Sequence, residues 1–451
     1  MIWLMETPSI GRRAFLAGGA RVAAGAGALA LTGCSAGDSG AGGATDVAIP
    51  SPAALRSWDG VRAQFDLAPE FAHFSAFVLA SHPTAVRAAI ERWRAELDAD
   101  PARAAADETT NDEAVRTAAA RYLGVAPEEI ALTDSTTMGL GLVYNGLRLK
   151  PGDHILTTTH DFYSTHESLR LTAARTGAEL EQVALYNNPA TASTDQMVSF
   201  LRSSVRPSTR VVALTWVHSS TGVKLPIREI ANELSEINTD RDPDERAILC
   251  LDAVHGLGAE DAVPAGLGCD IFISGTHKWL FGPRGTGLVW ARRDIWDRLS
   301  AIIPTFSGPS FGGWLFGERN PFLFGLDGTP GGFHSFEHRW ALTDAFDWHQ
   351  TIGKERVAER TRELATRLKE GLAEASNVHL LTPRDPELSS GIVCFTVAGR
   401  QPAEVTESLR HDHDILASVT PYRAQYVRFG TSIVTTPEQV DASVAAVAGM
   451  G

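Results

Sequence analysis

Lys278 is the residue of this sequence best placed to do covalent chemistry. It stands in the stretch SGTHKWLFGPRGTG, directly after a short apolar run at residues 270–274 (DIFIS). Such a run predicts a buried strand, so the lysine would lie at the mouth of a sheet. A partly desolvated lysine amine has a lowered pKa and can attack a carbonyl carbon to form a Schiff base. Most lysines are solvated surface groups, so this interpretation depends on what lies nearby.

A second apolar run, at residues 247–251 (AILCL), ends in Asp252, and His255 follows shortly after it. A buried carboxylate at a strand end can keep a cofactor's pyridine nitrogen protonated, which makes the ring an electron sink. The pair LDAVHG and SGTHKW, with GPRGTG behind it, resembles the cofactor site of fold-type I pyridoxal phosphate enzymes of aminotransferase class V. That family includes cysteine desulfurases and isopenicillin N epimerase-like proteins, and the resemblance implies pyridoxal 5'-phosphate as the cofactor.

The resemblance also gives these residues their roles. Lys278 would hold the cofactor as a Schiff base and, once an amino acid displaces it, act as general base at Cα. Asp252 would stabilise the developing carbanion through the ring, and His255 would orient Asp252 and the phenolic oxygen of the cofactor. His277 and the Thr276 hydroxyl would assist the cofactor phosphate.

Hydroxyl side chains follow another run end, in the stretch TDSTT at residues 133–137. Hydroxyls and free backbone N–H groups at a helix start bind anions, which suits Ser135 and Thr136 to a phosphate. An ordinary helix N-cap has the same sequence pattern. The family resemblance favours the phosphate, because the family's phosphate loop occupies this position in chain order.

The stretch TTHDFYST, at residues 158–165, matches the place where the family stacks a ring on the cofactor. Phe162 fits that role best and Tyr163 is the competing assignment; offset stacking contributes about 1 kcal/mol beyond burial. Ser219, in ALTWVHSSTG, stands where many relatives carry an Asn that hydrogen-bonds the phenolic oxygen. The shorter serine side chain leaves that contact open.

Three further residues are assigned by resemblance. Arg428, in YVRFGTSIVTTPEQVD, matches the arginine that clamps the substrate α-carboxylate, for which a guanidinium offers two parallel donors. Ser75, in FAHFSAFVLA, would contact the substrate, or would cap local backbone instead. Thr329, in DGTPGG, would reach the phosphate of the neighbouring subunit, which implies a homodimer with shared active sites. A plain turn is the competing interpretation of that stretch.

Short apolar runs alternate with amphipathic stretches from about residue 113 to residue 292. This pattern predicts an α/β domain with a mostly parallel sheet flanked by helices, whose ligands bind outside the carboxyl ends of the strands. The resemblance implies the PLP-dependent transferase fold type I. We expect an N-terminal segment at residues 51–100 that contributes to the site and the small domain, a large cofactor-binding domain at residues 101–334, and a small α+β C-terminal domain at residues 335–451.

The first residues resemble a targeting segment rather than part of the fold. Arg12 and Arg13 precede a Gly- and Ala-rich apolar stretch, so residues 1–33 resemble a Tat export signal. The segment ends in LTGC, which resembles a lipobox with Cys34 as the lipidated residue; the alternative is that Cys34 is incidental. Residues 34–50 would form a flexible tether. We therefore expect an exported, extracytoplasmic protein that contacts the membrane only through a lipid anchor.

Composition limits the other classes of function. The chain has 451 residues, 44% of them hydrophobic, enough for two sizeable globular regions. A formal net charge of -14, without a Lys/Arg cluster, argues against nucleic acid as a partner. The spacing of His160, Asp161 and His166 matches no firm metal-ligand pattern, so no metal is predicted.

The expected function is that of a pyridoxal phosphate enzyme acting on an amino acid or amine. In the family, a desulfurase needs a nucleophilic cysteine shortly before the terminal arginine, and residues 415–427 contain none. Epimerase, transaminase and C–S lyase chemistry all stay open. The alternative is an exported, non-catalytic binding lipoprotein on the same fold, against which the intact Lys278, Asp252 and Arg428 argue.

Overall fold

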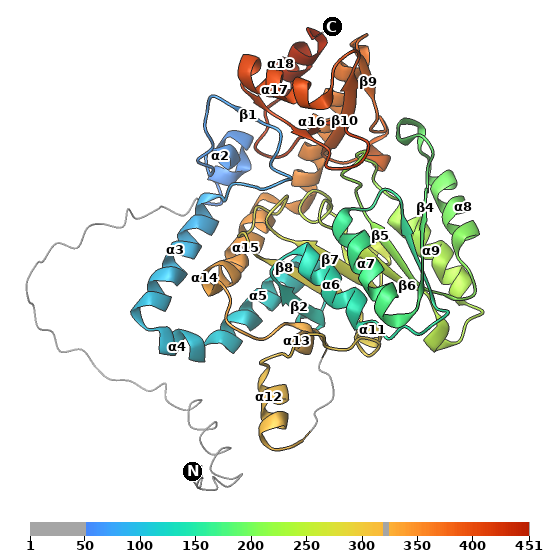
Figure 1. Cartoon of the computed structure of the whole chain (residues 1–451). Helices are drawn as coiled ribbons and strands as arrows, with labels where there is room; N and C mark the ends of the chain where they lie inside the picture. Colours follow the sequence, from blue (N-terminus) through green and yellow to red (C-terminus); the bar gives the residue numbers. More distant parts are fainter. Residues whose placement is uncertain (1–50, 319–323, 451) are drawn as a thin grey trace, which may run out of the picture. The chain divides into compact units, whose positions relative to one another are not determined.

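The computed structural model describes residues 51–318 and 324–450. Seven short strands form the central sheet of the large domain (Figure 1). Their order across the sheet is β2 (Ile130–Thr133), β8 (Gly287–Ala291), β7 (Ile271–Gly275), β6 (Ile248–Asp252), β5 (Thr209–Thr215), β3 (His154–Thr158) and β4 (Glu179–Val183). β8 runs antiparallel to both of its neighbours, and every other pair is parallel. The prediction of a mostly parallel sheet is confirmed.

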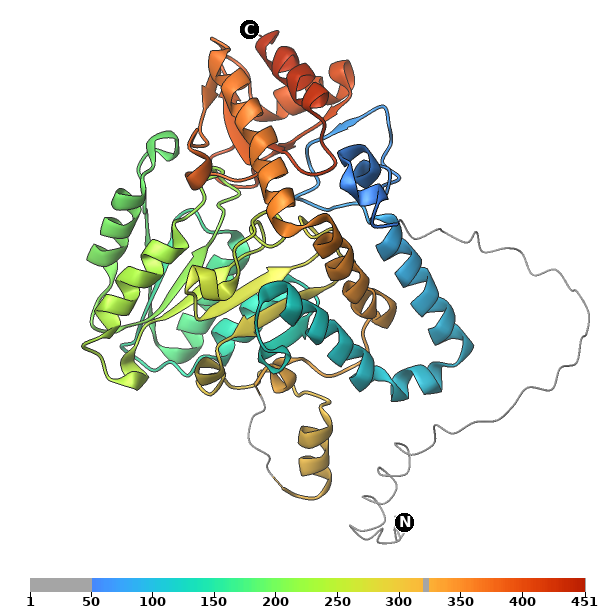
Figure 2. The same ribbon diagram turned by 180° about the vertical axis from the view of Figure 1, so that it is seen from behind.

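Helices cover both faces of this sheet because its strands carry apolar side chains on both faces. In β6, for example, Leu249 and Leu251 belong to one core, whereas Ile248 and Cys250 belong to another. Successive side chains of a strand point to opposite faces, so each face needs its own cover. Helices α5 (Glu108–Leu123), α8 (Thr194–Ser204) and α9 (Ile227–Asn238) pack on the first face, and α6 (Thr136–Gly146) and α7 (Tyr163–Thr176) on the second. Figure 2 shows the sheet from behind.

The C-terminal part of the chain builds a smaller antiparallel sheet with helices beside it (Figure 1). Its strands, in order, are β12 (Ser418–Val419), β13 (Val427–Gly430), β10 (Ile392–Val397) and β9 (Val378–Leu380). Helices α16 (Lys354–Glu374), α17 (Pro402–His413) and α18 (Pro437–Ala448) share one apolar core with this sheet. This is the α+β unit that the sequence predicts.

The N-terminal segment contacts both parts of the fold. Strand β1 (Ala72–His73) pairs in parallel with β11 (Ile415–Leu416), next to the small sheet. Helix α3 (Thr84–Ala99) then packs against α14 (Phe336–Trp340) and α15 (Leu342–Ile352). The residues between β1 and α3 therefore pass from one part of the fold to the other.

The predicted export signal, the twin arginines, Cys34 and the tether lie outside the described residues. Among the described helices, none combines the length and the apolarity that a membrane crossing requires. The described residues also contain no group of three or more His, Cys, Asp or Glu side chains that could hold a metal ion.

Candidate active site

A cavity of about 320 Å³ opens at the carboxyl ends of the parallel strands. The ends of β2, β3, β5, β6 and β7 all supply residues to it or to the turns that line it, and β13 closes it from the small domain. Before α3, the buried Phe77 and the exposed Val78 also line it. Nine of the predicted site residues line this one cavity: Ser135, Thr136, Phe162, Ser219, Asp252, His255, His277, Lys278 and Arg428.

Lys278 extends from the turn that follows β7. Its Nζ lies 3.4 Å from Nε2 of His255. Burial lowers the pKa of Lys278 to about 8; the Asp252 carboxylate opposes that shift and the Arg428 charge adds to it. The free amine therefore predominates above about pH 8 and is lost as the pH falls below it, which leaves about a tenth of the lysines unprotonated at pH 7.

Asp252 is the last residue of β6 and is only 2% exposed. Its Oδ1 accepts a hydrogen bond from the backbone N–H of Val254 at 3.1 Å. Burial raises the pKa of Asp252 to about 6, while that bond and the Lys278 charge act in the opposite direction. A cation placed beside this carboxylate would lower its pKa further, because opposite charges favour the ionised form. The site is thus suited to a ligand that carries a positive ring nitrogen.

Asp161 decides which aromatic side chain faces the cavity. Its carboxylate accepts hydrogen bonds from Thr157 Oγ1 and from the backbone N–H groups of Thr158 and Thr215, each at 2.7 Å. These bonds tie the ends of β3 and β5 together and fix the start of α7. Phe162 then lines the cavity, whereas Tyr163 is 70% exposed and lies outside the lining.

Two hydroxyls and a helix start form the end of the cavity that was assigned to phosphate. Ser135 is the N-cap of α6, and its Oγ accepts from the backbone N–H of Met138 at 3.1 Å. Thr136 Oγ1 accepts from the backbone N–H of Gly275 at 2.7 Å. Thr137, which was not predicted, lines the cavity beside them. The first N–H groups of a helix have no partner inside the helix, so this corner of the cavity is electropositive.

Arg428, on β13, is held from two sides. Its Nε donates to Ser418 Oγ at 3.1 Å and its Nη1 to the backbone oxygen of Ser219 at 3.1 Å. The guanidinium carbon lies 4.6 Å from the centre of the Phe77 ring. Only 6% of Arg428 is exposed, so the side chain is fixed with its remaining donors available to the cavity that it lines. The Ser219 hydroxyl has a different partner, Tyr422 Oη at 2.8 Å.

The structure does not bring three of the predicted residues to the cavity. The Thr276 hydroxyl pairs with the Thr286 hydroxyl inside its own turn, so it faces away from the lining residues. Ser75 lines two other cavities, because the chain between β1 and α3 turns it away from Lys278. The Thr329 hydroxyl accepts from the backbone N–H of Leu132 in β2 and donates to the backbone oxygen of Gly325 in α13 (Phe324–Gly328). Its role toward a neighbouring subunit stays a prediction.

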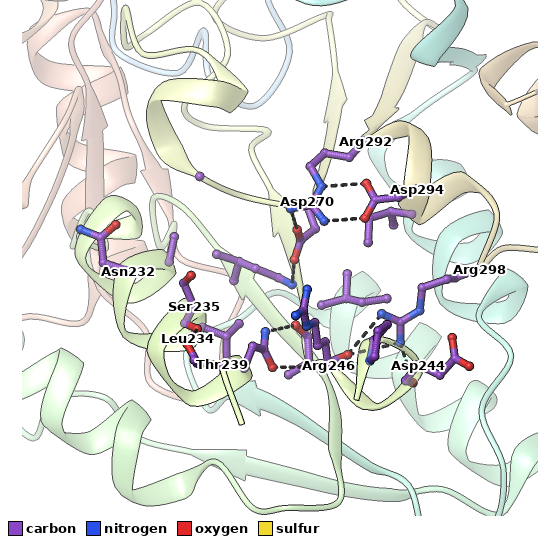
Figure 3. A pocket seen from close by; sticks show the side chains of 18 of the residues that line it. Asn232, Leu234, Ser235, Thr239, Asp244, Arg246, Asp270, Arg292, Asp294 and Arg298 are labelled. Carbon is purple, nitrogen blue, oxygen red and sulfur yellow. Dashed lines mark hydrogen bonds and ion pairs between the residues drawn. The ribbon is translucent and has the colours of Figure 1, made fainter. Parts of the chain in front are cut away.

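A larger cavity, of about 670 Å³, lies at the opposite edge of the sheet, where β6 and β7 begin (Figure 3). Several of its charged side chains already have partners in the protein. Asp270 accepts from the backbone N–H of Leu249 and pairs with Arg292, which also pairs with Asp294. Arg298 donates to backbone oxygens. None of the described buried atoms that lack a hydrogen-bond partner lines this cavity.

The cavity at the carboxyl ends of the strands, by contrast, is lined by residues with unpaired buried polar atoms. Nδ1 of His277 and Oγ1 of Thr215 are buried, line this cavity and have no hydrogen-bond partner among the described residues. Buried polar atoms are nearly always paired. The cavity therefore offers an amine, a buried carboxylate, an anion-binding helix start and unsatisfied polar atoms. This set fits a ligand with a carbonyl carbon, a ring nitrogen and a phosphate.

Fold and site together define a pyridoxal phosphate enzyme of fold type I. The chain belongs to the aminotransferase class V family, whose sequence profile matches residues 80–442. Isopenicillin N epimerase of Streptomyces clavuligerus is 26% identical over 341 residues, 72% of this chain and 81% of that protein. A probable cysteine desulfurase of Xylella fastidiosa strain Temecula1 is 28% identical over 404 residues, 84% of this chain and 87% of that protein.

Among solved structures, a mutant of C-DES with glycine covalently linked to its PLP cofactor is similar to this chain. The TM-score is 0.76 at 22% identity, over 86% of this chain and 99% of that one. Such a likeness shows the fold alone. The cofactor of this chain is pyridoxal 5'-phosphate, as the family requires and as the residues of the cavity fit.

Proposed function

We propose that this class V enzyme acts on the α-amino group of a free amino acid and that Lys278 moves a proton at Cα. The observation that carries the proposal is the meeting of Lys278, Asp252 and Arg428 in one cavity, although they come from the turn after β7, from β6 and from β13. A nucleophilic amine, a buried carboxylate and a fixed guanidinium are what an α-amino acid and a pyridoxal cofactor need.

Each side chain has a separate task in this proposal. When bound, pyridoxal phosphate supplies an electron sink for charge that develops at Cα. The guanidinium of Arg428 binds the α-carboxylate and so orients the amino acid. Asp252, at the end of β6, would hold a negative charge toward the ring nitrogen. The start of α6 and its hydroxyls hold the phosphate. The Lys278 amine, once free, takes the Cα proton on Nζ.

We propose further that the reaction does not use a cysteine of this cavity as a nucleophile. The described cysteines Cys250, Cys269 and Cys394 are buried outside the lining. Burial raises the pKa of Cys394 to about 12, and a thiol that stays protonated is a poor nucleophile. Residues 415–427, before Arg428, contain no cysteine. Epimerisation, transamination and β-elimination are the reactions compatible with this set of side chains.

A panel of amino acids separates these reactions. The purified protein, loaded with pyridoxal phosphate, is expected to convert at least one amino acid, detected as the opposite enantiomer, a keto acid or an elimination product. Arg428→Gln removes charge-assisted hydrogen bonds to the carboxylate, so kcat/KM for that substrate should fall by on the order of 10- to 100-fold. Arg384→Gln, which changes an arginine outside the cavity lining, is the matched control. Arg428→Gln with unchanged kcat/KM would contradict the assignment of the carboxylate.

We also propose a homodimer, because one segment exposes many large apolar side chains, and contiguous apolar patches often mark interfaces between proteins. Between β8 and α14, most large apolar side chains are at least partly exposed, including Phe306 at 58%, Trp314 at 74% and Phe333 at 80%. Helix α12 (Gly308–Leu315) carries part of this surface and projects from the sheet (Figure 1). Sedimentation should give twice the chain mass, and Trp314→Ser should shift it toward one chain mass. A wild-type protein that sediments as one chain at micromolar concentration would rule the dimer out.

A further inference from the structure

Trp279 follows Lys278 in the chain and reaches the same histidine from the other side. Its indole Nε1 donates a hydrogen bond to Nδ1 of His255 at 3.2 Å. The opposite ring nitrogen of His255, Nε2, lies 3.4 Å from Lys278 Nζ. Trp279 is 3% exposed and His255 is 5% exposed, so water does not replace either contact. The imidazole therefore bridges the indole and the lysine amine.

This geometry selects one tautomer of His255. A neutral imidazole has one N–H and one lone pair, and an indole N–H can only donate. Because Nδ1 has to accept from Trp279, the proton of the neutral ring resides on Nε2. The ring is neutral because burial holds the pKa of His255 well below its ordinary value, and the charges of Lys278 and Arg428 act in the same direction.

The selected tautomer matters to the lysine. An Nε2–H group can donate to the lone pair of a free amine, but an ammonium group has only donors to offer in return. The Nε2–H tautomer thus favours the free amine of Lys278. With the proton on Nδ1, the bare Nε2 would instead accept from the ammonium form and favour the charged lysine.

We propose that Trp279 is a positioning residue, which holds His255 in the Nε2–H tautomer and so keeps the Lys278 amine free to attack a carbonyl carbon. The inference rests on the proposed function. The inference adds a residue that does not line the cavity and whose hydrogen bond reaches Lys278 through His255. The other titratable or charged groups around the pair are Asp252, which favours the ammonium, and Arg428 and His277, which disfavour it or the imidazolium.

Trp279 also has a packing role, which the test has to separate from the hydrogen bond. Its ring stacks on Phe77, with centroids 6.1 Å apart and planes 20° apart. Its far edge lies against Gly391, where an added Cβ would come within 2.6 Å of Trp279 Cη2. Trp279→Phe removes the N–H and keeps most of the aromatic packing. Trp348→Phe is the matched control, because Trp348 is equally buried and its Nε1 has no hydrogen-bond partner among the described residues.

The first readout is the tautomer itself. In protein labelled with ¹⁵N-histidine, the ring-nitrogen shifts of His255, assigned with the His255→Gln variant, report which nitrogen carries the proton. Wild type and Trp348→Phe are expected to show the Nε2–H form, and Trp279→Phe a mixture of both forms. An Nδ1–H form in the wild type would overturn the proposal, even if the Trp279→Phe variant did not fold.

The second readout is the pH dependence with which Lys278 captures added pyridoxal phosphate, followed by borohydride reduction and mass spectrometry. Trp279→Phe should raise the midpoint by about one pH unit, which lowers capture about tenfold at pH values below the midpoint. In a His255→Gln background the same substitution should add nothing, since the effect passes through the imidazole. An unchanged midpoint in Trp279→Phe, or an equal shift in Trp348→Phe, would overturn the proposal. Absence of capture in every protein, wild type included, would instead refute the proposed function.

Discussion

Replacing Lys278 with alanine is expected to abolish covalent capture of pyridoxal phosphate and to lower kcat by on the order of 10²- to 10⁴-fold. Lys278 carries the only amine among the described residues that line the cavity. Arg428, the other cation close to it, stays protonated and cannot act as a nucleophile or a base. The variant therefore loses both the attachment point and the group that moves the Cα proton. Turnover and the visible absorbance of the loaded protein measure the two losses separately.

Lys354→Ala is the matched control for this experiment. Burial lowers the pKa of Lys354 as it does for Lys278, but its Nζ donates to the backbone oxygen of Tyr122 at 2.8 Å, outside the cavity. Lys354 has a lowered pKa but not the surrounding site, so Lys354→Ala should leave capture and turnover unchanged. If Lys278→Ala turned over substrate as fast as Lys354→Ala, the assignment of Lys278 would be wrong.

Replacing Asp252 with asparagine is expected to lower kcat by on the order of 10²-fold or more, while capture at Lys278 persists. The substitution keeps the shape of the side chain and an oxygen for the Val254 N–H, but it removes the charge. Burial raises the pKa of Asp252 to about 6, so the carboxylate is ionised above that pH and loses its charge below it. Without that charge, nothing at the end of β6 keeps the ring nitrogen protonated.

Steady-state kinetics of Asp252→Asn, beside mass spectrometry of the borohydride-reduced protein, separates the two effects. Asp270→Asn is a useful control, since Asp270 is also a mostly buried carboxylate with a raised pKa but lies at the opposite edge of the sheet. A kcat for Asp252→Asn within about twofold of the wild-type value would show that the carboxylate has no electronic role.

The central features of the site could be predicted because they depend on short sequence ranges. Lys278 and Asp252 each follow an apolar run, and runs of that kind end at the same edge of a parallel sheet. The alternation of apolar runs and amphipathic stretches also predicts the helix-covered sheet. The direction of β8 could not be predicted, because a buried run has the same composition in a parallel and an antiparallel strand.

Other contacts could not be predicted because they depend on where side chains point after folding. Phe162 rather than Tyr163 lines the cavity at the start of α7, next to Asp161, which accepts three hydrogen bonds, one of them from β5. That Phe162 stacks on the cofactor stays a prediction. The pairing of Ser219 with Tyr422 joins the large domain to the small one across 203 positions of the chain.

The position of Thr276, two residues before Lys278, made its hydroxyl a candidate for binding the cofactor phosphate. Its hydroxyl turns to Thr286 because the glycine-rich turn brings the two side chains together. The role of Trp279 could not be predicted from the sequence, in which only its place next to Lys278 is visible. The indole N–H matters only because the turn after β7 aims it at His255.

Borohydride reduction of the purified protein after addition of pyridoxal phosphate, followed by proteolysis and mass spectrometry, decides whether Lys278 holds the cofactor. We expect a visible absorbance band that reduction abolishes, and one reduced cofactor on the peptide that contains Lys278. The Lys278→Ala protein should carry no adduct on that peptide. A protein that stays colourless after addition of the cofactor, or that carries the adduct on a different lysine, would contradict the account.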